Sequence, residues 1–324
     1  MKTQLVAREG TGLGHKRHKD LLDITVLMGG PSSERQVSLV SGEAVAGALE
    51  RLGHRVQRAD ISPADTAALE RENIDVVFIA LHGQFGESGE VQELCERRRL
   101  RYTGSGPQAS RLAMDKSASK ELFRSAGLAT PDWLIVKKGQ DLKAIRSQLK
   151  ALGLPAVLKP VNGGSSVDIT IARDGGTRDE ALEGLLEKYP RAMVERFIKG
   201  RELTVGILGS RALPIIEIVP AREFYDYTAK YADDAGTQYL PDHGLPEALV
   251  QRVQQEALTA HNGLRCRDMS RVDFILDGSN VPWVLEINTI PGFTGHSLLP
   301  MAAAKAGVGF DMLVGGIAAM SLAR

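Results

Sequence analysis

The hydrophobic pattern of the chain begins with a strand, a glycine turn and a helix. Residues 23–28 (DITVLM) form a β-branched run that ends at residues 29–31 (GGP), and an apolar periodicity typical of a helix follows from Val37 to Leu49. The pair Ser32-Ser33 precedes this stretch and supplies candidate N-caps. This part of the chain therefore predicts one strand-turn-helix unit.

A second unit of the same kind follows. Residues 75–81 (DVVFIAL) form a buried-looking run, before a glycine-rich loop at 82–89 and a helical pattern at 91–99. Such alternation predicts a parallel sheet, whose ligands bind at the carboxyl ends of its strands. Both glycine-rich loops lie at such ends, which makes them candidate binding loops.

The remainder of the chain changes to an α+β pattern. We expect helices near residues 108–114, 116–126, 141–152, 179–187, 246–262, 298–306 and 311–322. We expect strands near residues 133–136, 156–159, 167–172, 193–196, 203–208, 212–219, 269–276 and 282–287. The resulting organisation is a disordered tail at residues 1–22, an N-terminal α/β domain at 23–106, a central domain at 107–194 and a C-terminal domain at 195–324.

Composition and charge narrow the class of protein. The 324 residues are 43% hydrophobic and 25% charged, and 40 basic residues balance 40 acidic ones, as in soluble proteins of more than one domain. This balance gives no reason to expect a nucleic-acid or membrane-surface partner. Cys95 and Cys266 are too few and too far apart for a disulfide framework or a metal site, which favours a cytoplasmic protein. Residues 1–22 lack the apolar segment of a signal peptide.

Two glycine-rich or polar segments are candidates for motion. Lys159 stands at a strand end before the loop 160–166 (PVNGGSS), which lacks the spacing of a Walker A loop; it is either a flap over phosphates or an ordinary turn. The polar segment 222–243 is too long for a simple connection. Its tyrosines and Lys230 favour an active-site lid over an incidental insertion.

Four residues near the C-terminus form the most informative constellation. Arg271 and Asp273 share one face of a predicted strand, and Glu286 and Asn288 share one face of the next. If the two strands pair as a hairpin, all four side chains converge. Three oxygen donors beside an arginine suit Mg²⁺, whereas an isolated Arg/Asp pair is equally typical of a salt bridge on a sheet surface.

Several motifs in a fixed order resemble the D-alanine-D-alanine ligase family. They are GGPSSER at 29–35, LHG at 81–83 with Gly86-Glu87, YTGSG at 102–106, MDK at 114–116, the Lys159 loop, FYDY…AKY at 224–231 and the run from Ser270 to Pro300. The match covers about residues 23–320. It implies a three-domain ATP-grasp architecture with an N-terminal parallel α/β domain, in which the central and C-terminal domains clamp ATP between two sheets.

The resemblance also implies the ATP and metal sites. It assigns phosphate contacts to Lys116, Lys159 and Lys230, adenine and ribose contacts to Glu195 and Glu202, and apolar adenine walls to Phe197, Ile198, Phe224 and Leu285. Without this resemblance, the favoured interpretation of each of these apolar residues is that it belongs to the hydrophobic core. It assigns Mg²⁺ or Mn²⁺, as two ions, to Asp273, Glu286 and Asn288.

For the amino-acid substrates, the resemblance implies phosphorylation of one D-alanine followed by attack of a second. Glu34 would hold the first ammonium and link to Ser165 and Tyr231, Arg271 and the Gly292 N–H would stabilise the oxyanion, and Ser297, Leu298 and His82 would seat the second D-alanine. Alone, Glu34 reads as a helix-capping acid and His82 as a loop histidine.

The implied biology is peptidoglycan precursor synthesis by a homodimer. Two alternatives stay open: the same fold with D-serine or D-lactate as acceptor, and an ATP-binding homologue without turnover. Tyr231 on the lid favours D-alanine as the acceptor. Asp168 stands where many relatives have glycine. The flap of this chain therefore departs from the family pattern at this position.

Overall fold

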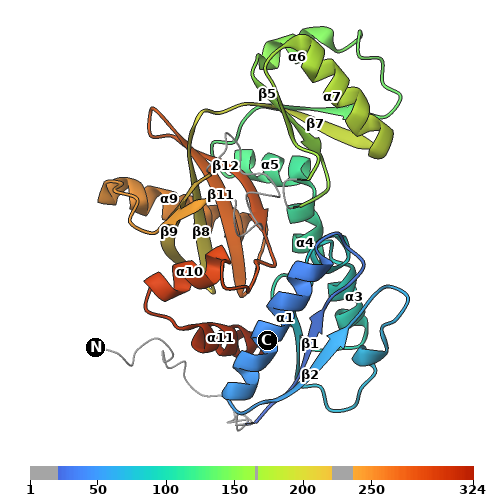
Figure 1. Cartoon of the computed structure of the whole chain (residues 1–324), viewed down its shortest axis with the longest axis vertical. Helices are drawn as coiled ribbons and strands as arrows, with labels where there is room; N and C mark the ends of the chain where they lie inside the picture. Colours follow the sequence, from blue (N-terminus) through green and yellow to red (C-terminus); the bar gives the residue numbers. More distant parts are fainter. Residues whose placement is uncertain (1–20, 165–166, 221–235) are drawn as a thin grey trace.

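A computed structural model describes residues 21–164, 167–220 and 236–324. Three sheets follow one another along its longest axis (Figure 1). Most of the predicted tail and lid, with the flap residues 165–166, lie outside the described part. The mixed architecture, with a parallel sheet first and antiparallel sheets after it, confirms the predicted fold class.

The first sheet has the order β2-β1-β3, and both of its pairings are parallel. Its elements are β1 (Asp23–Met28), α1 (Arg35–Arg51), β2 (Arg55–Asp60), the 3-10 helix η1 (Ala67–Leu69), β3 (Val76–Ile79), α2 (Gln84–Glu87) and α3 (Glu90–Arg97). Because β1 and β3 are neighbours, the loops after them meet: the Ser32 hydroxyl donates to the His82 carbonyl at 2.7 Å.

Two features of this sheet differ from the prediction. Strand β2 was not anticipated because its sequence, RVQRAD, is polar and it runs at the sheet edge with mostly exposed or half-buried side chains. The predicted loop at 82–89 carries the short helix α2. Neither segment has the hydrophobic periodicity from which an element is inferred.

The second sheet is antiparallel, with the order β4-β7-β5-β6. Its region comprises α4 (Pro107–Met114), α5 (Lys116–Ser125), β4 (Trp133–Lys137), α6 (Arg146–Leu152), β5 (Ala156–Pro160), β6 (Thr170–Ala172), α7 (Gly175–Lys188) and β7 (Arg191–Arg196). Helix α6 begins at Arg146 rather than near residue 141, and β6 begins at Thr170 rather than at Val167. Leucines of α6 and α7 pack with the strands in one core cluster.

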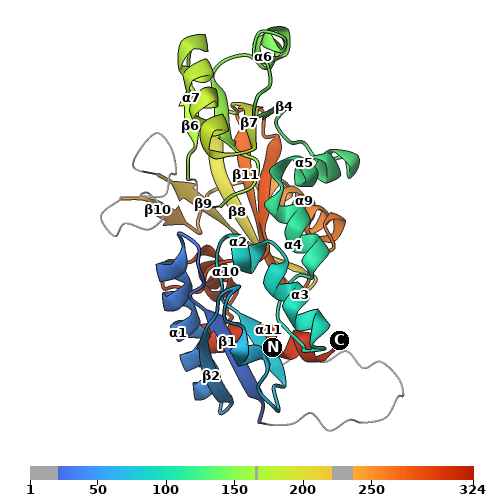
Figure 2. The ribbon, with the colours of Figure 1, turned by 90° about the vertical axis from the view of Figure 1, so that its right-hand side faces the viewer.

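The third sheet is antiparallel, with the order β10-β9-β8-β11-β12. Its region comprises β8 (Gly200–Leu208), β9 (Arg211–Val219), β10 (Gln238–Leu240), α9 (Glu247–Gly263), β11 (Met269–Asp277), β12 (Pro282–Asn288), α10 (Leu298–Lys305) and α11 (Phe310–Leu322). Helix α9 shares one core with this sheet. Figure 2 shows α10 and α11 between this sheet and the first one.

The first and third sheets share one hydrophobic core. Val26 and Phe78 of the first sheet belong to the same buried cluster as Ile216 of β9 and Leu299 of α10. Phe293 is fully buried in this cluster, with its ring centroid 5.7 Å from that of Phe78. This shared core holds the loops after β1 and β3 against the segment that follows β12.

Within the described residues, no single helix is both long and apolar enough to cross a membrane. The helices α10 and α11 meet the length and composition test only as a pair bent by 106°. Their buried residues belong to the core shared by the first and third sheets.

Candidate functional site

The predicted hairpin of β11 and β12 is present and brings the four-residue constellation together. Arg271 lies opposite Asn288, and Asp273 lies opposite Glu286. The Arg271 guanidinium donates to both carboxylate oxygens of Asp273, at 2.9 and 2.8 Å. Thr204 of the neighbouring strand β8 donates a third hydrogen bond to Asp273 at 2.6 Å. Both partners of the ion pair are largely buried, so this is not a solvent-exposed surface salt bridge.

The three predicted metal ligands offer oxygen donors on paired strands. Asp273 and Glu286 face each other across β11 and β12, and Asn288 is two residues beyond Glu286 on the same strand. Within the described ranges, no three His, Cys, Asp or Glu side chains gather as a metal cluster, so the Asn288 amide would have to supply the third oxygen. Two carboxylates and an amide fit Mg²⁺ or Mn²⁺, which take such ligands together with substrate phosphates.

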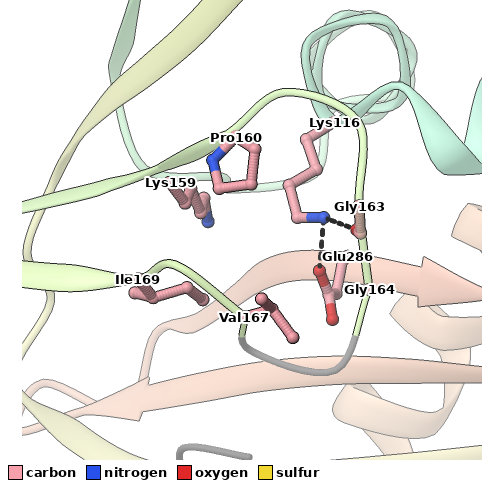
Figure 3. A pocket seen from close by; sticks show the side chains of 8 residues that line it. All are labelled: Lys116, Lys159, Pro160, Gly163, Gly164, Val167, Ile169 and Glu286. Carbon is pink, nitrogen blue, oxygen red and sulfur yellow. Dashed lines mark hydrogen bonds and ion pairs between the residues drawn. The ribbon is translucent and has the colours of Figure 1, made fainter. Parts of the chain in front are cut away.

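A cationic pocket adjoins these ligands (Figure 3). Its lining includes Lys116, Lys159, Gly163, Gly164 and Glu286. The Lys116 ammonium lies 3.4 Å from Glu286 and donates to the Gly163 carbonyl at 2.5 Å. Helix α5, strand β5 and the loop after β5 therefore present two lysines and two glycines to the carboxylates of the third sheet, an arrangement that suits a polyphosphate with a divalent ion.

Glu195 lies at the centre of a buried ionic cluster. Its carboxylate accepts from Lys159 at 2.6 Å, and the Lys120 ammonium is 2.5 Å from its other oxygen. Burial alone raises the pKa of Glu195, but the charges of Lys159 and Lys120 outweigh it and hold the pKa below its ordinary value. Burial lowers the pKa of Lys120 to about 8, against the attraction of Glu195.

Lys120 belongs to none of the sequence motifs that indicate the site. It is fully buried on α5, donates to Thr130 at 2.6 Å and lies over the Trp133 ring. A signal was present, because Lys116 and Lys120 are four residues apart and so share one face of the predicted helix. A lysine in that position is usually exposed, and only the packing of β4 and β7 beside α5 shows that this one is not.

The predicted adenine residues that the structure describes lie between the second and third sheets. Phe197 and Ile198 connect β7 to β8, and Leu285 precedes Glu286 on β12. All three are half-buried, whereas their neighbours Val194 and Val284 are fully buried. Half-buried apolar side chains leave surface for a planar ligand, which favours a slot over the plain-core interpretation. Glu202 is half-buried on β8, opposite Ile275.

Glu34 joins the first sheet to the pocket. It is buried at the start of α1, and its side chain makes no capping hydrogen bond, which argues against the capping interpretation. A Cβ added at Gly164 would lie 3.3 Å from Glu34 Oε2, and one added at Gly83 would lie 3.2 Å from the same atom. The acid therefore touches both the loop after β3 and the loop after β5.

The loop after β12 is closely packed. The Thr294 N–H donates to the Ser297 hydroxyl at 2.9 Å, and a Cβ added at Gly292 would lie 2.6 Å from the Ser297 oxygen. Ser297 is the N-cap residue of α10, and Leu298 begins that helix. His82 is buried, with Nε2 3.1 Å from the Ser41 hydroxyl. The structure thus brings His82, Gly292 and Ser297 to the junction of the first and third sheets.

Four predicted site residues lie outside the described residues: Ser165, Phe224, Lys230 and Tyr231. Asp168, the flap residue that departs from the family pattern, is among the residues that the structure describes. Its backbone is left-handed, with φ of 55°, a conformation that glycine adopts freely. Its carboxylate accepts from Lys188 at 2.9 Å and Tyr189 at 2.6 Å, which ties this end of the flap to the end of α7.

Two family models match the chain. The model described as "D-ala D-ala ligase C-terminus" matches residues 122–318, and "D-ala D-ala ligase N-terminus" matches residues 58–105. A curated D-alanine-D-alanine ligase from Anaeromyxobacter dehalogenans (strain 2CP-1) is 44% identical over 291 residues, which cover 90% of this chain and 94% of the relative.

Solved structures show the same likeness. A D-alanine-D-alanine ligase from Bacillus anthracis matches with a TM-score of 0.83 at 38% identity, and its complex with ATP matches with a TM-score of 0.82 at 34% identity. Each match covers 93% of this chain and 98% of that one. The VanG D-Ala:D-Ser ligase from Enterococcus faecalis matches with a TM-score of 0.81 at 26% identity, over 93% of this chain and 99% of that one.

Proposed function

The chain belongs to the D-alanine-D-alanine ligase family, and we propose that it joins two D-alanines into D-alanyl-D-alanine while converting ATP to ADP and phosphate. One observation carries the proposal. Glu34, an acid of the first sheet, meets the Gly164 loop beside the pocket that Lys116, Lys159 and Glu286 line. An ammonium-binding group thus adjoins a phosphate-binding pocket, as the phosphorylation of an amino acid requires.

In the first step, a carboxylate oxygen of the first D-alanine attacks the γ-phosphorus of ATP, and the bond to the ADP oxygen breaks. Glu34 holds the substrate ammonium and so orients the carboxylate toward the phosphate. Lys116 and Lys159 neutralise the phosphate oxygens, since phosphoryl transfer depends on positioning and charge neutralisation. Ser165 and Tyr231, which lie outside the described residues, would close the site from the flap and the lid and so exclude water from the acyl phosphate.

The nucleotide base and the divalent ions take adjoining positions. Glu195 and Glu202 bind adenine and ribose between Phe197, Ile198, Phe224 and Leu285, and Lys230 joins the phosphate ligands. Asp273, Glu286 and Asn288 would hold Mg²⁺ or Mn²⁺, and the ion would supply charge neutralisation at the phosphates. Lys116 lies beside Glu286, so its ammonium places positive charge in the region where the phosphates would bind.

In the second step, the free amine of the second D-alanine attacks the carbonyl carbon of the acyl phosphate. A tetrahedral oxyanion forms, the bond to phosphate breaks, and the proton lost by the nitrogen leaves with the phosphate. Arg271, oriented by its two hydrogen bonds to Asp273, and the Gly292 N–H stabilise the oxyanion, at about 3 kcal/mol for each such donor. Ser297, Leu298 and His82 seat the acceptor.

The cellular setting is part of the proposal. The product serves peptidoglycan precursors in the cytoplasm, in agreement with the two buried free thiols Cys95 and Cys266. We propose a homodimer formed through the first sheet region, supported by Val40 of α1, which is 50% exposed. Met312, which is 63% exposed, adds to this surface because its helix α11 packs against α1. Light scattering of the purified protein tests this. Residues 23–106, 107–194 and 195–324 are the proposed domains.

The acceptor is the part of the proposal to test first. The purified protein is incubated with ATP, Mg²⁺ and D-alanine, alone or with D-serine or D-lactate, and the products are identified by mass spectrometry. D-alanyl-D-alanine as the main product supports the proposal. The likeness to VanG makes D-alanyl-D-serine the specific alternative. Tight ATP binding without any of these products would identify a homologue that lacks turnover.

A further inference from the structure

One buried hydroxyl connects three segments of the acceptor side of the site. Ser41 lies on α1 and is fully buried. The Phe293 N–H donates to its oxygen at 3.2 Å, and His82 Nε2 lies 3.1 Å from the same oxygen. Ser41 thereby contacts both the loop after β3 and the loop after β12, which are far apart along the chain.

The direction of these hydrogen bonds follows from the number of protons. The Phe293 N–H uses one lone pair of the Ser41 oxygen, which leaves the hydroxyl proton for another acceptor. On the other side of the imidazole ring, His82 Nδ1 faces Glu87 Oε1 at 3.6 Å, and this carboxylate favours the tautomer with its proton on Nδ1. In that tautomer Nε2 accepts the hydroxyl proton of Ser41. The Ser41 hydroxyl then donates to His82 and accepts from the Phe293 N–H.

The same contact determines the orientation of the Gly292-Phe293 peptide. Phe293 N belongs to that peptide unit, and the Phe293 ring is held between Phe78 and Phe310, at centroid distances of 5.7 and 6.4 Å. Phe293 is thus held at its ring by apolar packing and at its amide by Ser41. A shift of α1 would therefore move the Gly292 loop and the His82 ring together.

We propose that Ser41 is a positioning residue for the second, acceptor amino acid. Its hydroxyl fixes the position of the His82 ring relative to the Gly292-Phe293 peptide. Ser41 itself touches no reacting atom. This inference rests on the proposed function, because that function assigns the acceptor to His82, Ser297 and Leu298. Loss of the hydroxyl leaves the buried Phe293 N–H and one His82 nitrogen without their partner, and the acceptor subsite loses its orientation.

The expected effect is specific to one substrate. Ser41→Ala raises the KM for the acceptor D-alanine about 10-fold, the size expected for an unsatisfied buried polar group. The KM for ATP and the KM for the first D-alanine stay within about twofold of the wild-type values, because the hydrogen bonds of the Ser41 hydroxyl go to His82 and Phe293 rather than to Glu34 or to the residues given as lining the Lys116 and Lys159 pocket. A merely structural role would instead change all constants together or none.

Ser38 provides a matched control. It is also fully buried on α1, but its hydroxyl donates at 2.8 Å to the Ala80 carbonyl, within the first sheet region. Ser38→Ala therefore removes one buried hydrogen bond from the same helix without touching the loop after β12. Thermal unfolding of both variants measures the common structural cost.

The experiment measures initial rates of phosphate release over a range of D-alanine concentrations, which separates the two KM values, and then over a range of ATP concentrations. An acceptor-specific rise in Ser41→Ala, absent in Ser38→Ala, supports the inference. Equal constants in the two variants, or a parallel rise for ATP, overturn it. If Ser41→Ala does not fold, Ser41→Cys takes its place, since a thiol hydrogen-bonds only weakly. A wild-type protein that forms no dipeptide refutes the proposed function instead.

Discussion

Asp273 and Glu286 lie directly opposite each other in the antiparallel pair of β11 and β12. Two carboxylates in such positions repel each other unless cations lie between or beside them. Here Arg271 binds Asp273 with two hydrogen bonds, and Lys116 lies 3.4 Å from Glu286. The pair thus concentrates negative charge at the end of the pocket, where a divalent ion would relieve it further.

Replacing one of these acids should weaken metal-dependent activity. Glu286→Gln keeps the shape of the side chain but removes its charge, so we expect activity at low Mg²⁺ to fall by roughly 100-fold and to recover partly at high Mg²⁺. Phosphate release measured across a Mg²⁺ titration checks this. The exposed Glu121 of α5 gives the control variant Glu121→Gln, and an unchanged Mg²⁺ dependence in Glu286→Gln would remove Glu286 from the metal site.

A side chain at residue 292 should disturb the loop after β12, whose Gly292 N–H is the proposed oxyanion donor. The Cβ of Gly292→Ala would lie 2.6 Å from the Ser297 oxygen, so Ser297 must move away from the Thr294 N–H. We expect kcat/KM for D-alanine to fall about 100-fold, as for small misplacements in a site, with little change in melting temperature. Gly295→Ala is the matched control, because a Cβ there meets nothing within 4 Å. Similar kinetics of the two variants would contradict this prediction.

Removing one lysine from the buried ionic cluster of Lys120, Lys159 and Glu195 should destabilise the fold, because it leaves a buried carboxylate with less compensating charge. Lys120→Met leaves the buried Glu195 carboxylate with Lys159 as its remaining lysine partner, and we expect the free energy of unfolding to fall by about 3 kcal/mol. Urea denaturation measures this. The double variant Lys120→Met/Glu195→Gln also lacks the charge of the Glu195 carboxylate. Its loss in the free energy of unfolding should therefore be smaller than the sum of the losses in the two single variants. Strict additivity would show that the charges are not coupled.

His261 should make the fold sensitive to mild acid. Burial lowers the pKa of His261 to about 4, while its Nδ1 lies 2.7 Å from the Ser270 hydroxyl. Between its ordinary pKa of about 6.5 and pH 4, the unfolded chain takes up a proton that the folded chain does not. The free energy of unfolding therefore falls as the pH falls through this window, by about 3 kcal/mol at most.

Urea denaturation at pH 7.5 and pH 5 tests the role of His261. The variant His261→Asn keeps a hydrogen-bonding side chain but does not titrate, so its loss of stability between the two pH values should be smaller than that of the wild type. Identical losses in both proteins would assign the acid sensitivity to other groups.

The hydrophobic pattern of the sequence predicted most of the helices and strands, including the two paired strands that carry the predicted metal ligands. Alternation placed Arg271 with Asp273, and Glu286 with Asn288, on common faces, and the structure shows that the two runs pair as the hairpin on which their convergence depended. Periodicity identified α1 and the parallel strands β1 and β3 for the same reason: it records which face of an element is buried. It could not identify β2, whose polar sequence is paired through backbone hydrogen bonds at a sheet edge.

Which of these elements contact one another depends on how the folded chain packs. Lys120 with Glu195, Ser41 with Phe293, and Glu34 with Gly164 are contacts between segments far apart in the chain. Each depends on how the three sheets pack, and for Ser41 on the core that joins the first and third sheets. A local pattern specifies that a face is buried but not what covers it. The geometry of this site is therefore a property of the packing between sheets.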